Sequence, residues 1–548
     1  MNLSTDTGTT ARPSRLGPAP GSEQIGQTGI FRGALVTASG IAGIVLLCKV
    51  VGFGEKIVVA HYLGTTRDAD CYYVALSFVW TAVFITAGVL QPGVLPVYVA
   101  VSKSGNENLR NQFATAVAIA LTLLLAALCV VVFLWPRACI RLIAPGLPDD
   151  ANLQAAGLLC LLVPGLGVLT FTTLTRTILN SNQQFCWAAL GELVFRATFF
   201  GGLALGLAGS GMGVTGAAFA MGALAGLATH VAAIVWRRGW PVALPGREVL
   251  PILRQTAMLA APLLVGTALS QVSQVADSVL ASLLEEGRIC SLMYARKLVD
   301  AIVLLGPVAL ATVLFSRFAA LAAEGGPGAL RLHVLQAIRG IVLISGPIAV
   351  LVVVLRHMIV RTLFEHGQFD SVSTSLTSSA LACYGLGIVA FSLDAALVST
   401  FFALRDTRTP ILIGIITTAT DLVLAWVLMQ GLGHAGIALS AALTKTAKVV
   451  WLIVMLDRRL DLQIRPGLLP VLGLAAPALG AMAIALYAGQ HLWHLCALPA
   501  NTVSDGLSLV ALSTSGLAAF VWCGCWSGVA ECKAVHRWLM HIPYRVRT

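Results

Sequence analysis

The chain has 548 residues, of which 57% are hydrophobic and only 11% are charged, and its formal net charge is +11. This composition excludes a soluble globular protein and a disordered one, and it indicates a protein that crosses a membrane many times. The basic excess does not indicate a nucleic-acid ligand, because the Lys and Arg residues gather in the loops on one side of the predicted spans.

The apolar runs predict an all-α polytopic membrane protein with about fourteen transmembrane helices. The runs lie near 33–54, 71–100, 111–135, 154–178, 187–208, 212–236, 253–283, 290–320, 334–360, 375–403, 410–430, 435–456, 467–489 and 507–529. Little sequence remains between them, so we expect no soluble catalytic domain and no enzymatic activity. Residues 1–30 are poor in apolar residues and predict a disordered tail, and residues 531–548 predict a basic one.

The sequence repeats itself once. Three pairs of segments match at an offset of 220 or 221 residues: Gly211–Ala218 with Gly431–Ala438, Cys139–Asp150 with Ile359–Asp370, and Val59–Ala75 with Leu280–Arg296. The repeat predicts two six-helix lobes in the same orientation, at 31–240 and 250–460, with two extra helices at 465–530. In transporters built from such repeats, the substrate site lies between the repeats near the middle of the membrane.

The loops predict the orientation of the chain. Those on the N-terminal side, together with both tails, hold roughly twenty Lys and Arg residues, and the other side holds roughly seven. Because positive charge stays on the cytoplasmic side, we expect both termini in the cytoplasm.

Charged residues in the first repeat gather at the ends of the first two predicted spans. Lys49 lies near the end of the first, Glu55 and Lys56 follow it, and Asp70 precedes the second. Charges at membrane depth are expensive and usually face a water-filled cavity or one another. We therefore predict that Lys49 and Lys56 help to bind a diphosphate, with Glu55 and Asp70 holding the cations in place. The alternative is that these residues snorkel to the interface or pair for stability.

The corresponding corner of the second repeat contains Arg296 and Lys297. We predict that both line the same central cavity. Arg would bind a diphosphate through paired hydrogen bonds, and Lys would act as a point charge.

Two carboxylates lie deep in other predicted helices. Asp277 is in the seventh helix and Asp421 in the eleventh, with Thr417 one turn from Asp421. Oxygen ligands suit a small cation, so we predict that these three residues bind Na⁺, or that one carboxylate carries a coupling H⁺. A hydrogen bond between helices is the alternative. Asp394 is a further candidate for this network.

Two further pairs of charged residues lie in the predicted spans. Glu192 and Arg196 are four residues apart and predict an intrahelical ion pair, whereas Lys445 and Lys448 are expected to snorkel. No catalytic constellation, metal site or organic cofactor site is evident in the sequence.

Several segments resemble the MurJ/MviN lipid II flippases. They are Met293–Leu298, Leu363–Phe369, Phe401–Pro410 and Gly433–Ser440, with Ala144–Gly146 after the third helix. The resemblance covers about residues 35–460 and implies two lobes around a V-shaped cavity, as in the wider superfamily of multidrug extruders and polysaccharide flippases. It implies that the chain moves an undecaprenyl-diphosphate-linked sugar from the inner to the outer leaflet of the bacterial cytoplasmic membrane by alternating access. Membrane lipids and other cell-envelope synthesis proteins are the further partners it implies.

The match to the family is incomplete. Lys49 and Lys297 stand where the family usually has Arg, Glu55–Lys56 reverses a usual Arg-Asp order, and residues 79–87 lack an expected Arg. Asp70 matches the acidic position of the family, and Asp277, Thr417 and Asp421 fall near a sodium site proposed in some members. Two alternatives therefore stay open. One is export of a different lipid-linked oligosaccharide, for an exopolysaccharide, and the other is drug/cation antiport.

Overall fold

The computed structural model describes residues 22–537 except 210, 239–242, 305–325, 405, 461–463, 496–501, 530 and 534–535. Every regular element in these residues is a helix, as the apolar runs predict. The first eight α-helices and one π-helical turn form the N-lobe. They are α1 (Ser22–Leu63), α2 (Arg67–Val89), η1 (Leu90–Val94), α3 (Leu95–Lys103), α4 (Glu107–Leu134), α5 (Pro136–Ile143), α6 (Asp149–Ser181), α7 (Phe185–Gly209) and α8 (Val214–Arg238).

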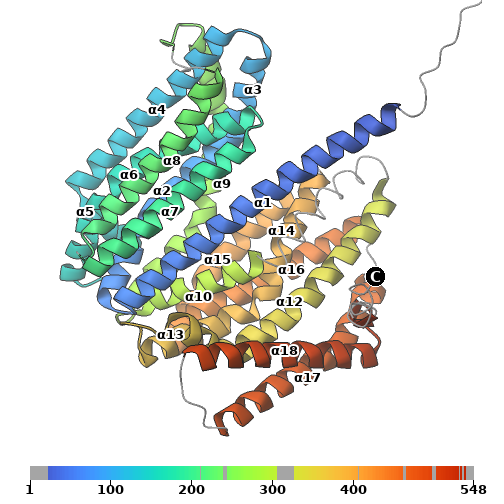
Figure 1. The fold of residues 1–548 in the computed structure, drawn as a ribbon. Coiled ribbons are helices and arrows are strands. Elements are labelled where there is room, and N and C mark those ends of the chain that lie inside the picture. Colours follow the sequence, from blue (N-terminus) through green and yellow to red (C-terminus); the bar gives the residue numbers. More distant parts are fainter. Residues whose placement is uncertain are drawn as a thin grey trace, which may run out of the picture.

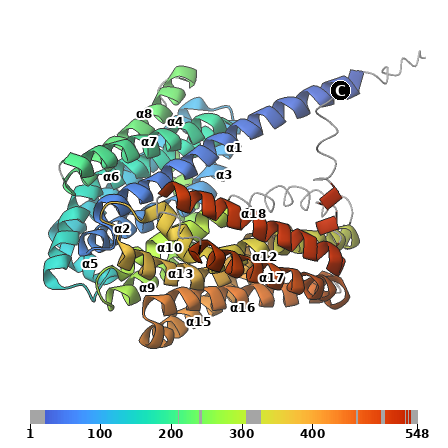
Figure 2. The same ribbon diagram turned by 60° about the horizontal axis from the view of Figure 1, so that its bottom comes forward.

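The remaining helices form the C-lobe and a C-terminal pair. They are α9 (Val249–Ser282), α10 (Arg288–Val303), α12 (Gly326–Phe364), α13 (Ser371–Leu386), α14 (Ile388–Ala403), α15 (Arg408–Leu432) and α16 (His434–Leu460), followed by α17 (Ile464–Leu495) and α18 (Thr502–Ser527). The C-terminal pair packs against α12 (Figure 2). This arrangement gives each extra helix a partner within the C-lobe.

Two predicted spans are interrupted. The span over 71–100 runs from Arg67 to Lys103 and contains the π-helical turn η1, which accommodates Pro92, a residue without a backbone N–H. The span over 375–403 is the pair α13 and α14, which bend by 47° where they meet at Gly387. Helix breaks at membrane depth are tolerated where neighbouring helices cover the exposed backbone.

The number of spans among the described residues is eleven, or twelve if the bent pair counts as one span. The predicted number of about fourteen is therefore not confirmed. The predicted span 33–54 lies within α1, and the span 290–320 begins with α10 and then leaves the described residues. Helix α1 begins at Ser22, so residues 22–30 of the predicted disordered tail are helical, while residues 1–21 lie outside the described part.

The two lobes meet near the C-terminal end of α1, where α10 and α13 also lie, and they separate toward the opposite end (Figure 1). We call this meeting place the joined end. It contains the loops that follow α1, α5, α9 and α12, spanning 64–66, 144–148, 283–287 and 365–370. Helix α9 also packs against α2 and α4, so it contacts both lobes along its length.

Two glycine contacts at the joined end mirror each other. Gly146 lies against Ser282, and its N–H donates to Ser282 Oγ at 3.1 Å. Gly367 lies against His61, whose carbonyl accepts from the N–H of Gln368 at 2.8 Å. His61 and Ser282 are 221 residues apart, as are the two glycines, so the contacts follow the internal repeat. A Cβ atom would lie 2.2 Å from the Ser282 carbonyl at Gly146 and 2.3 Å from the His61 carbonyl at Gly367, so neither site accepts a side chain without a shift.

Aromatic side chains fill the space beneath these contacts. Tyr294 of α10 lies with its ring 5.4 Å from that of Tyr73 and 5.7 Å from that of Phe369, and its hydroxyl donates to the carbonyl of Gly64 at 3.1 Å. Phe364 packs against the same ring at 5.3 Å. Large buried rings from both lobes therefore hold the joined end closed in this conformation.

Candidate functional site

A small charged pocket lies between α9, α10 and α13. It has a volume of about 50 Å³, and charged or polar side chains dominate its lining: Gln274, Asp277, Ser278, Arg296, Lys297, Asp300 and Tyr384. Three of the predicted site residues, Asp277, Arg296 and Lys297, thus come together in one place. Asp300, a further charge that the sequence places at membrane depth, completes the group.

The two cations of this pocket share one carboxylate. Arg296 Nε donates to Asp300 Oδ1 at 3.2 Å, and Lys297 Nζ donates to Asp300 Oδ2 at 3.3 Å. The guanidinium of Arg296 also lies over the rings of Tyr384 and Phe391, at 5.5 and 5.1 Å from their centroids. The rings fix the position of the guanidinium, whose five N–H donors exceed the single hydrogen bond that it donates to Asp300. Arg296, Lys297 and Asp300 together carry one net positive charge, and Asp277, which lines the same pocket, adds a second carboxylate beside Arg296.

Lys49 approaches this group from the N-lobe. Its side chain is exposed on α1, and its electrostatic neighbours are Arg196 and Glu192 on one side and Lys297 and Asp300 on the other. The structure therefore brings Lys49 and Lys297 of opposite lobes into one electrostatic environment.

Glu55 and Lys56 form a closed pair. Lys56 Nζ lies 2.5 Å from Glu55 Oε1, and the two residues are only 8% and 6% exposed. The hydroxyl of Tyr72 donates to the same oxygen at 3.2 Å, and the ammonium lies over the ring of Tyr73. The sequence left two roles open for these residues, anion binding and pairing for stability, and the observed geometry fits pairing.

Asp70 connects the lobes rather than lining the pocket. Its buried carboxylate accepts from the backbone N–H of Gly287 at 2.6 Å and of Cys290 at 2.8 Å. These groups form the N-terminus of α10, where unpaired N–H groups and the helix dipole favour a negative charge. Asp70 of α2 thereby fixes the start of the helix that carries Arg296 and Lys297.

Asp421 is the centre of a polar cluster in the C-lobe. Its carboxylate accepts from Ser440 Oγ at 2.9 Å, from Thr444 Oγ1 at 3.1 Å and from Ser273 Oγ at 2.9 Å. Asp277 is an electrostatic neighbour of Asp421 and of Arg296. The hydroxyl of Thr417 donates instead to backbone carbonyls of its own helix, so its contacts are not those of the cluster. Three hydroxyl groups that the sequence did not single out surround Asp421 instead.

A second charge group lies in the N-lobe. Glu192 accepts from Arg196 of the same helix at 2.8 Å, which confirms the predicted ion pair, and from Arg176 of α6 at 3.0 Å. Gly52 of α1 leaves room for Arg196, because a Cβ there would lie 3.0 Å from the guanidinium. Arg176 was missed, although a charge at the end of a predicted span is itself a signal.

A third charge group lies in the C-lobe. Asp394 binds Lys445 at 3.1 Å and Lys448 at 2.8 Å, across α14 and α16. The expectation that the lysines snorkel to the membrane surface is therefore wrong, because their ammonium groups turn to a carboxylate within the lobe. Asp394 pairs with these lysines, not with Asp277 and Asp421.

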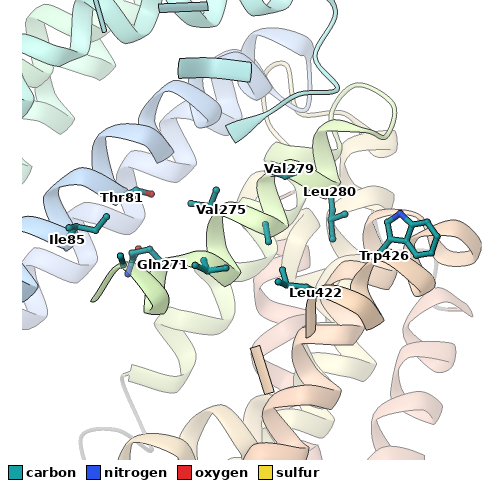
Figure 3. Close-up of a pocket in the computed structure, with 11 residues that line it drawn as sticks. Thr81, Ile85, Gln271, Val275, Val279, Leu280, Leu422 and Trp426 are labelled. Atoms are coloured by element: carbon teal, nitrogen blue, oxygen red, sulfur yellow. The ribbon is translucent and has the colours of Figure 1, made fainter. Parts of the chain in front are cut away.

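An apolar pocket lies on the other side of α9 (Figure 3). It has a volume of about 560 Å³, and residues of α2, α9 and α15 line it, among them Thr81, Ile85, Val275, Val279, Leu422 and Trp426. Neighbouring positions of α9, such as Asp277 and Ser278, face the charged pocket instead. One helix thus separates an apolar environment from a charged one.

Among the described residues, no group of three or more His, Cys, Asp or Glu side chains is placed to hold a metal ion. The arrangement that the described residues do offer is a set of partly exposed cations on the facing sides of two lobes. Such a set is suited to binding an anion.

Comparison with known proteins places this geometry in context. The family model described as "Lipid II flippase MurJ" matches residues 59–503. The probable lipid II flippase MurJ of Rhizobium meliloti (strain 1021) is 27% identical over 427 residues, which cover 75% of this chain and 79% of that protein. The probable lipid II flippase MurJ of Vibrio cholerae is 24% identical over 505 residues, which cover 87% and 92%.

Solved structures share the fold. A structure of lipid II flippase MurJ in an inward closed conformation matches with a TM-score of 0.75 at 20% identity, covering 88% of this chain and 97% of that one. An inward-facing multidrug resistance MATE family transporter of the MOP superfamily matches with a TM-score of 0.65 at 15% identity, covering 76% and 95%. The two-lobed architecture is therefore that of the superfamily that the sequence resembles.

Proposed function

The chain belongs to the lipid II flippase MurJ family, and we propose that it moves lipid II, an undecaprenyl-diphosphate-linked glycan, between membrane leaflets by alternating access. The observation that carries the proposal is the group of Arg296, Lys297 and Asp300 on α10, which packs against α1 of the other lobe, where Lys49 is an electrostatic neighbour of Lys297 and Asp300. A diphosphate needs several donors with positive charge in a site shielded from bulk water.

The proposed reaction forms no covalent bond. In the first step the diphosphate displaces part of the Asp300 contact and takes hydrogen bonds from Arg296 and Lys297. Lys49 then approaches from the other lobe and neutralises further charge. Rocking of the lobes opens the joined end, and the anion leaves on the other side. Separation of the lobes weakens binding of the diphosphate, because Lys49 moves away from Arg296 and Lys297.

The proposed orientation places both termini in the cytoplasm of a bacterium and the chain in its inner membrane. The excess of Lys and Arg on the N-terminal side of the spans supports this. The joined end then faces outward, and the described conformation is closed toward the outer leaflet. The inside-negative potential favours outward movement of an anion by about 2.3 kcal/mol per charge per 100 mV.

The lipid tail needs an apolar environment while the headgroup crosses. The pocket of about 560 Å³ between α2, α9 and α15 supports this part of the proposal, because its lining is almost entirely apolar (Figure 3). Helix α9 contributes residues to both this pocket and the charged pocket. The lipid tail comes from a bilayer that is as apolar as this pocket, so it can enter without contact with water and without a large change in free energy.

Ion coupling is a further part of the proposal. Asp421 with Ser273, Ser440 and Thr444 offers hard oxygen atoms of the kind that Na⁺ prefers, and Asp277 is the nearby carboxylate that would carry H⁺ instead. Either ion would act by favouring one arrangement of α9 against α15 and α16, since the cluster draws on all three helices.

The test is complementation of a bacterium depleted of its own lipid II flippase. We expect the unaltered chain to restore growth. The double variant Arg296→Gln with Lys297→Gln should fail to restore growth, although it reaches the same level in the membrane as the unaltered chain. The control is Arg137→Gln with Arg141→Gln, which removes two exposed charges from α5 and should still complement.

Two results contradict the proposal. Growth restored by the double variant would remove Arg296 and Lys297 from the site. No growth with the unaltered chain at a normal membrane level would exclude lipid II as the cargo. In that case, restored synthesis of an exopolysaccharide would identify a different lipid-linked glycan, and resistance to cationic dyes would identify an antiporter.

A further inference from the structure

Three groups of charged residues share one composition, two cations around one carboxylate. The N-lobe triad is Arg176, Glu192 and Arg196, the central triad is Arg296, Lys297 and Asp300, and the C-lobe triad is Asp394, Lys445 and Lys448. Taken alone, each triad carries one net positive charge. At the central triad, Asp277 lies beside Arg296 and can balance the second cation, so the second cation of each outer triad is the one that needs an explanation.

The three triads form one row. Lys49 has electrostatic neighbours in both the N-lobe triad and the central triad, and Arg296 of the central triad is an electrostatic neighbour of Lys445. Together with Lys49, and with Asp277 counted beside Arg296, the row holds seven cations and four carboxylates, a net charge of +3. It extends from α6 and α7 of one lobe to α14 and α16 of the other.

The C-lobe triad places two ammonium groups at membrane depth. Lys445 and Lys448 lie near the middle of α16, which spans His434–Leu460, and a Lys at the centre of a membrane helix is unfavourable to insert. Asp394 can offset only one of them. Their side chains are 29% and 15% exposed, so the surplus charge is neither sealed nor fully hydrated.

A diphosphate cannot satisfy the whole row. It is a compact group, and Lys49 with the central triad already supplies three cations to hold it. The C-lobe triad lies beyond Arg296, on other helices. An anionic group that reaches it must therefore be a different part of the cargo.

We propose that the C-lobe triad is a second anion subsite, which binds a carboxylate on the glycan or peptide portion of the cargo. The inference rests on the proposed function, since it assumes a diphosphate at the central triad. Two lysines suit this task because each ammonium has three donors and engages Asp394 through only one or two contacts. The cargo class is therefore a lipid-linked glycan with at least one acidic group besides the diphosphate.

The test compares two lipids on the purified full-length protein in lipid nanodiscs. One is lipid II with its acidic peptide, and the other is undecaprenyl diphosphate linked to a single neutral N-acetylhexosamine. The variant is Lys445→Gln, which leaves the 2.8 Å pair of Lys448 and Asp394 intact and neutral, so the fold keeps its buried ion pair. Lys445→Arg is the control that keeps the charge.

We expect Lys445→Gln to weaken binding of lipid II about tenfold or more, the scale of one hydrogen bond between charged groups, and to leave binding of the neutral-sugar lipid unchanged. Lys445→Arg should restore most of the loss. An equal loss for both lipids, or no loss for either, would overturn the second subsite while leaving the proposed function intact. Failure of the unaltered protein to bind either lipid would overturn both.

Discussion

Lys56 and Glu55 in the N-lobe form an ion pair with side chains only 10% and 8% exposed, whereas the side chains of the central triad are 30–47% exposed. Both groups place charges at membrane depth and both were predicted to bind the same anion. In the first, the Tyr72 hydroxyl donates to the carboxylate and the Tyr73 ring lies beneath the ammonium, so the pair is buried. In the second, one carboxylate holds two cations that remain accessible.

Charge at membrane depth does not by itself identify a binding residue. A sealed pair stabilises one arrangement of the surrounding helices, since its members cannot be solvated or reach a ligand. An open triad with a surplus cation can exchange its internal partner for an external anion. Exposure and charge balance together separate the two roles, and each can be tested by mutation.

The largest effect is expected from Glu55→Gln. It leaves the ammonium of Lys56 buried without its counter-ion, and breaking a buried ion pair costs about 3–5 kcal/mol. Thermal unfolding of the purified protein should show a clear loss of stability. Adding Lys56→Met should recover much of it, because neither charge then remains buried.

The matching change in the open triad is Lys297→Gln, which leaves Asp300 bound to Arg296 at 3.2 Å. It should reduce transport with little effect on the unfolding temperature. If Glu55→Gln were as stable as the unaltered protein, or Lys297→Gln as unstable as Glu55→Gln, the distinction between sealed and open groups would fail.

The sequence predicted the broad architecture well, because apolar run length and an internal repeat are properties of the chain itself. The repeat offset of 221 reappears in the contacts of Gly146 and Gly367. The bend at Gly387 and the helical start at Ser22 were not predicted, since periodicity does not show a kink in a continuous apolar run.

The site was predicted only in part, because spacing along one helix does not reveal which side chains meet across helices. The pair Glu192 and Arg196 was predictable at four residues apart. Its third member Arg176 comes from α6, and the lysines that bind Asp394 come from a helix more than fifty residues later in the chain. Likewise, the sealing of Lys56 depends on Tyr72 and Tyr73 of the next helix.

The second-largest effect is expected from Asp70→Ala, which removes a contact between the lobes. It removes two hydrogen bonds from the N-terminus of α10, and bonds to a charged partner contribute about 1.5–3 kcal/mol each. Because Asp70 and α10 belong to different lobes, the population should shift toward a conformation with the joined end open. Distances between spin labels on α5 and α13 should lengthen.

The control for Asp70 is Asn106→Ala, which removes the cap of α4 within a single lobe. It should lower the unfolding temperature slightly and leave the distance distribution unchanged. An unchanged distribution in Asp70→Ala would show that the cap does not contribute to holding the lobes together.

The third-largest effect is expected from Gly146→Ala. The new Cβ would lie 2.2 Å from the Ser282 carbonyl, so the joined end would have to open slightly, at a cost of about 1–3 kcal/mol for overpacking. Gly157→Ala is the control, because no atom lies within 4 Å of its Cβ position. The measurement uses a cysteine in place of Ser282, on a background with the native cysteines replaced. Its accessibility to a water-soluble thiol reagent should rise in Gly146→Ala and not in Gly157→Ala. Equal accessibility in both variants would mean that the contact relaxes without opening the end.

The smallest effect is expected from Arg141→Ala, in an ion pair that is neither sealed nor part of a triad. Arg141 lies 2.7 Å from Asp149, but the side chains are 61% and 88% exposed, so water screens the attraction and ordering two long side chains offsets part of the gain. Such pairs contribute about 0–1 kcal/mol, and the unfolding temperature and complementation should both stay near those of the unaltered protein. The short distance alone would rank this pair beside Glu55 and Lys56. A loss of stability as large as that of Glu55→Gln would show that distance, rather than burial, decides the contribution of an ion pair in this protein.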